Sequence, residues 1–484
     1  MRNIQPSRVF HYFSKISAIP RCTGNEQAIS DYISNTAQSL DLDVHQDPFG
    51  NLIIRKPGQY GMEYGPTVIL QGHLDMLCLK AADSKHDFET DPIPMHVSGD
   101  LIITDGVSLG AGNGIAIAMY LAILENDEIP HPPLEVVLTV QEEAGLIGAQ
   151  ALDAQQLKGR YLVNMDSEQE GEFIIGCAGE QRLEVDFELE HRLEEKLRPV
   201  EISVQGLKGG HSGMDIAKNR GNALKILAHI LNDLQDQYTI RLSKFEGGTK
   251  VNVIPSDARA QIWINVGEEK AIRQAVIKRF RAYTTDMQQV ENAQIHVIEL
   301  SEALPPLMSL YSENLVALLT ALPSGVRFMS NTIDNLVDTS INMGAVQWKG
   351  NHVALHLSLR SSTPAREAAL LNEVKAIAKG FGATVKLRNA YPHWRIEKGV
   401  HLHRMFIDQW RKEAGTEPKL TAVHAGLECS ILGRKLNERS NKPAIEMIAF
   451  GPDLFDAHTV DESLSISSVQ RTYGFLVKML GKLE

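Results

Sequence analysis

Cysteine is scarce in this sequence of 484 residues, and its four positions are far apart. Cys22, Cys78, Cys177 and Cys429 include no CxxC pair, so their spacing indicates neither a disulfide framework nor a thiolate zinc site. We therefore expect four reduced thiols and a cytoplasmic protein, because free cysteines are typical of reducing compartments.

Long hydrophobic runs and an excess of positive charge are also missing. No stretch approaches the roughly 18 to 20 apolar residues that span a bilayer, and the N-terminal MRNIQPSRVFHYFSKISAIP lacks the cationic start and apolar block of a signal peptide. The 48 Lys and Arg stand against 60 Asp and Glu, a net charge of −12. We expect no membrane span, no signal peptide, and neither nucleic acid nor an anionic membrane as a partner.

The composition and length are those of a folded protein with two domains. The 43% hydrophobic and 22% charged residues argue against extensive disorder, and one core rarely organises so long a chain. Strand and helix patterns alternate up to about residue 180, which predicts an α/β layer with a largely parallel sheet. Helices are expected at 9–16, 25–40 and 115–124, and strands at 51–55, 67–70, 134–140 and 161–164.

The middle of the chain has a different pattern. RLEVDFELE alternates apolar and polar residues, which is typical of a sheet with one wet face. Helix patterns near 223–234, 268–281 and 366–379 mix with strand patterns, and the α/β texture returns from about His401. We predict a discontinuous α/β domain at 1–182 and 400–484, interrupted by an inserted α+β domain at 183–399.

The first candidate site residues follow the apolar strand in VILQGHLDM. His73 and Asp75 lie at its carboxyl end, where open α/β sheets bind ligands. A neutral imidazole can bind a metal, and a nearby carboxylate can orient it. A hydrogen-bonded histidine at a strand end is the competing interpretation.

Further carboxylates and a second imidazole follow other apolar strands. Glu142 and Glu143 follow LEVVLTVQ, Asp166 ends YLVNMD, and His458 comes after AIEMIAF and a Gly-Pro loop. Adjacent side chains after a strand point in different directions, so one glutamate could bind a metal while its neighbour moves protons. Oxygen and nitrogen ligands without sulfur favour zinc or manganese in a hydrolytic site.

Three glycines alternate in SLGAGNGIA, at Gly110, Gly112 and Gly114. The spacing fits neither the G-x-x-x-x-G-K-[ST] phosphate loop nor the G-x-G-x-x-G dinucleotide loop. We expect a turn that leads into a helix starting near Ile115.

Together these motifs resemble the M20 family of di-zinc metallopeptidases, specifically its aminoacyl-histidine (Xaa-His) dipeptidase branch. The resemblance covers nearly the whole chain. It implies a catalytic α/β domain with a mixed, largely parallel sheet and helices on both faces, an inserted α+β lid domain, and a homodimer formed through that lid. The motifs are QGHLDM, LGAGNGI, QEEAGLIGA, NMDSEQEGE, GCAGE, GLKGGHSGMDI, RGNA, VNVIP, YPHW, HAGLEC and GPDLFDAH.

The resemblance also implies a role for each candidate residue. Asp75 would orient a ligand histidine, and Glu142 would be the general base that takes a proton from the attacking water and passes it to the leaving amine. Two zinc ions are expected, with manganese or cobalt as substitutes. The implied ligands are His73 and Asp166 for one ion and Glu143 and His458 for the other.

The chain departs from the family at Gly112, where an aspartate bridges both metals. Two dications about 4 Å apart repel by roughly 16 kcal/mol at an effective dielectric near 20, and a shared anion offsets much of that. Asn113 is neutral, whereas Asp105 could reach in. A bridging hydroxide or a single metal are the other possibilities, and we expect reduced metal affinity and turnover.

Other implied residues surround the substrate. His211 in GGHSG would stabilise the oxyanion, and Asn252 in VNVIP would add a polar contact. Arg360 in LSLRSS would bind the substrate carboxylate, and Glu428 in HAGLEC would lie near its amino end. Without the resemblance, His211 capping a glycine turn and Arg360 in a surface ion pair are favoured. His393, where the family has glycine, puts side-chain preference in question.

The leading hypothesis is a metal-dependent hydrolase of unblocked dipeptides that prefers a C-terminal histidine, as in β-alanyl-histidine. A metal-impaired or inactive dipeptide-binding relative is one alternative, because of Gly112. A tripeptidase or deacylase of the same family is another.

Overall fold

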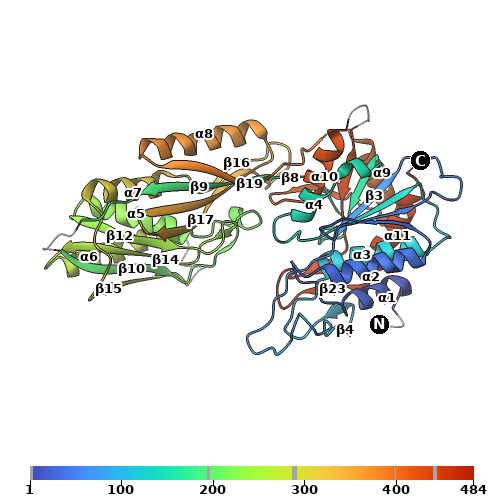
Figure 1. The fold of residues 1–484 in the computed structure, drawn as a ribbon, viewed down its shortest axis with the longest axis horizontal. Coiled ribbons are helices and arrows are strands. Elements are labelled where there is room, and N and C mark those ends of the chain that lie inside the picture. The colour runs from blue at the N-terminus through green and yellow to red at the C-terminus, as the bar shows by residue number, and fades with distance from the viewer. Residues whose placement is uncertain (1–3, 193–196, 286–291, 398, 440–443, 484) are drawn as a thin grey trace. The chain divides into compact units, whose positions relative to one another are not determined.

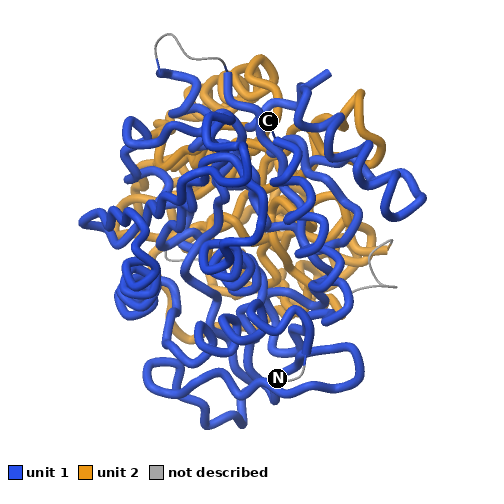
Figure 2. Tube along the Cα trace, turned by 90° about the vertical axis from the view of Figure 1, so that its right-hand side faces the viewer, with its two compact units in different colours: residues 1–177, 394–422, 426–484 blue, residues 178–393, 423–425 orange. Residues whose placement is uncertain are grey.

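The computed structural model describes residues 4–192, 197–285, 292–397, 399–439 and 444–483. The chain forms two compact units (Figure 2). Unit 1 comprises residues 1–177, 394–422 and 426–484, and unit 2 comprises residues 178–393 and 423–425. Within the described residues, no helix is long and apolar enough to cross a membrane.

Unit 1 is built around an eight-stranded mixed sheet with the order β1-β2-β6-β3-β7-β21-β8-β20. Strands β6, β3, β7 and β21 are parallel neighbours. Helices pack on both faces (Figure 1). In β3, a Cβ at Gly72 would meet Tyr120 of α3, whereas Gln71 contacts Glu428 of α10. Because alternate side chains of a strand face opposite sides, α3 and α10 cover opposite faces.

The central strands of this sheet are buried along their whole length, as expected for parallel strands covered on both sides. A small four-stranded sheet, β22-β23-β5-β4, completes the unit. The strands are β1 (Asp43–Gln46), β2 (Leu52–Lys56), β3 (Val68–His73), β4 (His96–Ser98), β5 (Leu101–Ile103), β6 (Leu134–Thr139), β7 (Tyr161–Asn164), β8 (Glu172–Cys177), β20 (Lys419–Val423), β21 (Glu446–Ala449), β22 (Leu454–Phe455) and β23 (Ser463–Ser465). The helices are α1 (Ser7–Ile16), α2 (Gln27–Ser39), α3 (Ala111–Glu125), α4 (Ile147–Ala151), α9 (His401–Ala414), α10 (Glu428–Asn437) and α11 (Ile466–Leu480).

Unit 2 contains a nine-stranded sheet with the order β15-β10-β14-β12-β17-β18-β9-β19, in which β16 also pairs with β17. Its strand pairs are antiparallel, and β14 alternates buried and more exposed residues. The mixed α/β architecture with an antiparallel insertion confirms the predicted fold class. The elements are β9 (Gly179–Glu188), β10 (Leu197–Gln205), β11 (Gly210–His211), β12 (Ile240–Gly247), β13 (Val253–Ile254), β14 (Ala258–Asn265), β15 (Gln294–Glu299), β16 (Gly325–Met329), β17 (Val337–Lys349), β18 (His352–Ser361), β19 (Thr384–Tyr391), α5 (Ala223–Gln235), α6 (Glu269–Thr284), α7 (Ser309–Ala321) and α8 (Pro364–Gly380).

The prediction of four reduced thiols is wrong for two of them. Cys22 and Cys78 form a disulfide with Cα atoms 5.6 Å apart, whereas Cys177 and Cys429 are buried and lie outside it. The partners are 56 residues apart and meet because Cys22 itself forms a parallel β-bridge with Met76, two residues before Cys78. This contact joins two loops, so the spacing of cysteines along the chain gives no sign of it.

Helix α3 begins at Ala111, four residues before the predicted start at Ile115. Gly112 and Gly114 therefore lie in the helix, and Gly110 alone of the three glycines has a positive φ, 68°. The earlier start follows from Glu462, whose carboxylate accepts the N–H groups of Leu109, Gly110 and Ala111 at 2.8–3.0 Å. This acceptor satisfies amides that the helix leaves unpaired. The proposed domain boundaries, 1–182 and 400–484 against 183–399, stay a prediction.

Candidate active site

Five of the predicted side chains lie together at the carboxyl edge of the unit 1 sheet. The parallel strands β6, β3 and β7 end at this edge, which explains why the residues that follow them meet. His73 Nε2 lies 3.9 Å from Asp166 Oδ1 and 4.0 Å from Glu142 Oε2. His458 Nε2 lies 3.1 Å from Glu143 Oε1. Ligand atoms of His73, Glu142 and Glu143 all fall within 4.8 Å of one another.

Asp75 connects the first imidazole to the paired glutamates. Its Oδ1 lies 3.1 Å from His73 Nδ1 and accepts the Glu142 N–H at 3.0 Å. Its Oδ2 accepts the Glu143 N–H at 3.2 Å and the Thr23 hydroxyl at 2.9 Å. One buried carboxylate therefore orients an imidazole and fixes the turn that holds both glutamates.

Asn113, the neutral neighbour of Gly112, connects the Asp166 side chain to the His73 backbone. Its Nδ2 donates to Asp166 Oδ1 at 2.5 Å, and its Oδ1 accepts the His73 N–H at 3.0 Å. Both contacts come from the first turn of α3, which presents Asn113 to the ends of β3 and β7. The position of Asn113 in the glycine motif was visible in the sequence, but these partners were not.

Gly112 leaves space beside this cluster. A Cβ built there would meet only Leu454 Cδ2, at 3.9 Å. The alternative that Asp105 takes over is wrong, because the Asp105 side chain is 82% exposed and lies 3.7 Å from His96 Nδ1.

The cluster has an excess of negative charge. Burial, together with the charges of Glu143 and Asp166, raises the pKa of Glu142 well above its usual range, and burial also raises the pKa of Asp166. Burial alone would lower the pKa of His73, but Asp75 and the neighbouring carboxylates raise it well above 6.5. The hydrogen bond to Glu143 raises the pKa of His458 to about 9. Neighbouring carboxylates thus draw protons to the site in the absence of a cation.

This donor set fits a divalent cation. Two imidazoles and three carboxylates offer nitrogen and oxygen atoms and no sulfur, the combination that zinc and manganese accept in hydrolytic sites. A dication would supply the positive charge that these carboxylates lack.

Glu428 lies behind this cluster, at the start of α10. Its Oε2 accepts hydrogen bonds from Gln71 Nε2 and from Thr139 Oγ1, the latter at 2.7 Å. Its Oε1 is buried and has no hydrogen-bond partner among the residues that the structure describes. Burial raises the pKa of Glu428 to about 7. Gln71 in turn accepts a hydrogen bond from Asn164 at 2.7 Å, so a buried polar network supports this carboxyl.

Arg360 lies in unit 2 and is buried, so the predicted surface ion pair is wrong in its location. Its Nη2 lies 3.1 Å from Glu180 Oε1, its Nη1 donates to Tyr391 Oη at 2.5 Å, and its Nε donates to Ser212 Oγ at 3.4 Å. Burial would raise the pKa of Glu180, but the charges of Arg360 and Arg182 lower it. Sequence reasoning missed Glu180; only the register that places it opposite Arg360 identifies it.

His211 and Asn252 also lie in unit 2, on neighbouring short strands or turns. His211 Nδ1 accepts the N–H groups of Gly213 at 3.3 Å and Met214 at 3.1 Å, which agrees with the interpretation of a histidine capping a glycine turn. This acceptor role places the proton of a neutral ring on Nε2. The Asn252 carbonyl accepts the Ser212 N–H at 2.9 Å.

Comparison with known proteins decides the family. A family model described as a peptidase dimerisation domain (M20_dimer) matches residues 202–288. The cytosol non-specific dipeptidase of Escherichia coli (strain K12) is 32% identical over 489 residues, covering 100% of this chain and 99% of the relative. The chain belongs to the M20 peptidase family. This result confirms the predicted resemblance and, with it, the predicted enzyme class, a peptide hydrolase.

Solved structures of peptidases agree with this assignment. The aminoacylhistidine dipeptidase of Vibrio alginolyticus is 32% identical with a TM-score of 0.83, and the match covers 100% of this chain and 98% of that one. Aminopeptidase PepT of Bacillus cereus shares the fold, with a TM-score of 0.57 at 17% identity and 99% coverage of both chains.

Proposed function

We propose that the chain is a metal-dependent dipeptidase that hydrolyses unblocked dipeptides and prefers a C-terminal histidine. The observation that supports this most directly is the convergence of His73, Glu142, Glu143, Asp166 and His458 on one sheet edge. The names of the Escherichia coli and Vibrio relatives support the dipeptidase activity and the histidine preference, respectively. We include in this proposal the cytoplasmic location that the first name carries, a compartment in which the Cys22–Cys78 disulfide is an exception.

The metal ligands in this proposal are His73 and Asp166 for one position and Glu143 and His458 for the other. Zinc is the expected ion, with manganese or cobalt as substitutes. A bound dication polarises the scissile carbonyl and makes water a better nucleophile near neutral pH. Asp75 holds His73 in the ring orientation and tautomer that a ligand needs.

Glu142 is the proton carrier. It takes a proton from the attacking water and gives it to the leaving amine. Its carboxylate lies 4.0 Å from His73 Nε2, slightly farther than Asp166 at 3.9 Å. The other imidazole, His458, lies 3.1 Å from Glu143. Burial and the neighbouring charges raise its pKa, and a carboxylate with a raised pKa holds a proton more readily near neutral pH.

The substrate's ends are assigned by family resemblance. The Arg360 guanidinium binds the C-terminal carboxylate, Asn252 adds a polar contact, and His211 donates from Nε2 to the developing oxyanion. Glu428, whose Oε1 has no hydrogen-bond partner in the described part of the chain, lies near the substrate's amino end. His393 adjusts side-chain preference, and unit 2 acts as the lid through which a homodimer forms.

The second candidate is a metal-impaired relative that binds dipeptides with little or no turnover. Gly112 is the observation in its favour, because no carboxylate occupies that position. The remaining ligands and Glu142 are all present, which favours the active enzyme.

A peptide panel tests the proposal. The protein is stripped with a chelator, reloaded with zinc, manganese or cobalt, and assayed with β-alanyl-histidine, an alanine-terminated dipeptide, a tripeptide and an N-acetylated dipeptide. We expect metal-dependent cleavage of both dipeptides, faster for the histidine-terminated one. Cleavage only of the tripeptide or the acylated peptide supports another hydrolase of the family, and no cleavage with any metal supports the impaired relative.

A further inference from the structure

The segment Arg21–Thr23 braces the backbone around the candidate metal centre. Arg21 is 2% exposed, and its Nη1 donates to the carbonyls of Leu74 at 3.0 Å and Asp75 at 3.2 Å. Its Nη2 donates to the Gly110 carbonyl, at the start of α3. The guanidinium therefore joins the loop that bears Asp75 to the loop that leads to Gly112.

Thr23 adds a direct contact to the same centre. Its hydroxyl donates to Asp75 Oδ2 at 2.9 Å, and its N–H donates to the Met76 carbonyl at 3.3 Å. The Met76 N–H donates to the Arg21 carbonyl at 3.1 Å. Displacing this segment would remove one of the four contacts that orient the Asp75 carboxylate.

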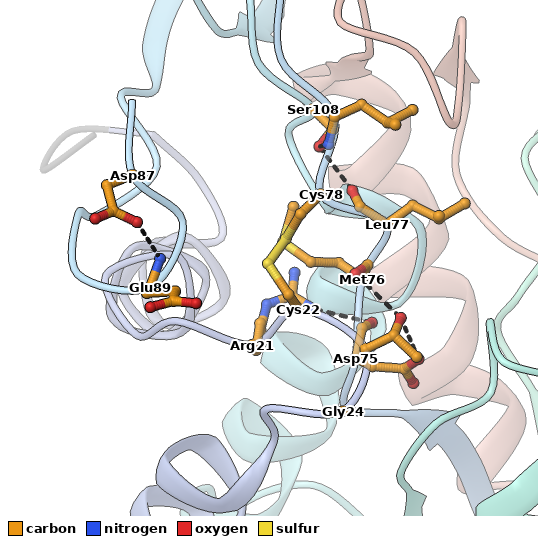
Figure 3. Close-up of a disulfide and its surroundings, with 12 residues drawn as sticks. Arg21, Cys22, Gly24, Asp75, Met76, Leu77, Cys78, Asp87, Glu89 and Ser108 are labelled. Atoms are coloured by element: carbon orange, nitrogen blue, oxygen red, sulfur yellow. Dashed lines mark hydrogen bonds between the residues drawn. A yellow bond between two sulfur atoms is a disulfide. The ribbon is translucent and has the colours of Figure 1, made fainter. Parts of the chain in front are cut away.

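The Cys22–Cys78 disulfide connects this segment to the loop that bears Asp75, three residues beyond Asp75 itself (Figure 3). Around Cys78, the Ser108 hydroxyl donates to the Leu77 carbonyl at 2.7 Å and accepts the Leu79 N–H at 3.0 Å. The Ser108 N–H donates to the Leu79 carbonyl at 2.8 Å. The cross-link thus ties the bracing segment, the Asp75 loop and the approach to α3 into one unit.

Both cysteines are half-buried, so a small reductant can reach the bond without unfolding the core. Without the cross-link, the covalent path between Cys22 and Cys78 is the 56-residue separation along the chain, and the loops around them gain conformational freedom. The Asp75 carboxylate contacts both Thr23 and His73. Greater freedom of the Thr23 segment would therefore loosen the orientation of Asp75 and, through it, of His73.

We propose that the Cys22–Cys78 disulfide is a positioning cross-link for the metal centre and that its reduction weakens metal binding. The inference rests on the metal centre of the proposed function. A phosphine reductant donates two electrons and breaks the S–S bond. Water supplies the two protons of the new cysteine thiols, and its oxygen passes to the phosphine, which becomes a phosphine oxide. Loss of an interaction that orients a ligand typically lowers metal affinity about 10- to 100-fold.

The test is a cobalt titration of the full chain, followed by the visible absorption of Co²⁺. The oxidised protein is compared with protein reduced by a phosphine, which avoids metal chelation by a dithiol, and with Cys22→Ser/Cys78→Ser. We expect the reduced protein and the double variant to share a 10- to 100-fold higher Kd and an altered cobalt spectrum. Reoxidation should restore only the wild type. The altered spectrum separates ligand positioning from a general loss of stability.

Cys177→Ser is the matched control, because it replaces a buried cysteine outside the disulfide and keeps the cross-link; it should bind cobalt like the wild type. Equal Kd values for oxidised and reduced protein overturn this inference alone. Four reactive thiols in the denatured, air-exposed protein also overturn it. If the oxidised protein binds no cobalt, the metal centre of the proposed function fails together with it.

Discussion

At the scale of the residue, Gly112 occupies the first turn of α3 next to the candidate metal ligands. Neither packing nor backbone conformation requires glycine there, because a Cβ would meet only Leu454 at 3.9 Å and the residue is not among those with positive φ. Glycine in a helix costs about 1 kcal/mol relative to alanine. The chemical consequence of Gly112 is therefore the absence of a charge, in a position that could accommodate one.

Gly112→Asp should increase metal binding. The new carboxylate offsets repulsion between two dications, so we expect zinc content after dialysis to rise towards two ions per chain and the affinity of the weaker position to rise at least tenfold. Metal analysis by mass spectrometry measures both. Gly112→Asn is the matched neutral control and should leave zinc content near that of the unaltered chain. Two tightly bound ions in the unaltered chain would contradict this expectation.

Glu142 and Glu143 are neighbours with different predicted roles, so they form a natural pair of variants. Glu142→Gln removes the proton carrier and should lower kcat by about 10²- to 10⁴-fold with zinc content unchanged. Glu143→Gln removes a ligand and should lower zinc content itself. Activity and metal analysis on the same samples distinguish the two. Loss of zinc in Glu142→Gln would show that the roles are exchanged.

The candidate ligands could be located in the sequence because each follows a recognisable apolar strand, and family resemblance supplied their roles. Residues that position them could not be found in this way. Asn113 reaches Asp166 from 53 residues away, and Glu462 reaches Ala111 from 351 residues away. Such partners depend on how loops return to the sheet edge, which no local pattern records.

At the scale of the element, most helices and strands follow their hydrophobic periodicity, and the largest shift of a start is in α3. Local propensity predicts that three alternating glycines form a turn, but the Glu462 carboxylate satisfies the amides of Leu109 to Ala111 and allows the helix to begin there. Tertiary context overrides propensity at this point.

A buried ion pair between Glu180 and Arg360, which are register partners, lies in the pairing of β9 with β18. Glu180→Gln should lower the free energy of unfolding by about 3–5 kcal/mol at pH 7, because it leaves a buried guanidinium uncompensated. The pKa of Glu180 is lowered in the folded protein, so its contribution exists above the unfolded pKa and is lost as pH falls through the folded value. The difference in the free energy of unfolding between wild type and Glu180→Gln should therefore become smaller at acid pH.

Urea denaturation at pH 7 and near pH 3.5 measures this difference. Glu184→Gln, on the same strand, is the matched control, since its partner Arg388 is half exposed and a smaller loss is expected. Equal stability of Glu180→Gln and wild type at pH 7 would show that the pair does not stabilise the sheet.

At the scale of the whole molecule, the alternation of strand and helix in both ends of the chain and the antiparallel pattern in the middle predicted the two architectures now observed. The disulfide could not be predicted, because it depends on two loops meeting in the folded unit. Arg360 was expected on family grounds, but its burial against Glu180 required the strand register.

The match of residues 202–288 to a peptidase dimerisation domain leads to an expectation about assembly. Light scattering at micromolar concentration should give twice the chain mass of 53.6 kDa. A scattering mass of 53.6 kDa for the full chain, the mass of one copy, would remove the dimer from the proposed function.

The central claim is that imidazoles and carboxylates from distant parts of the chain hold a hydrolytic metal. Anomalous diffraction from zinc-loaded crystals tests it most directly. We predict a zinc peak about 2.0–2.2 Å from a His73 ring nitrogen and a carboxylate oxygen of Asp166, with any second peak at Glu143 and His458. Zinc bound elsewhere on the chain, with this cluster empty at saturating metal, would contradict the account.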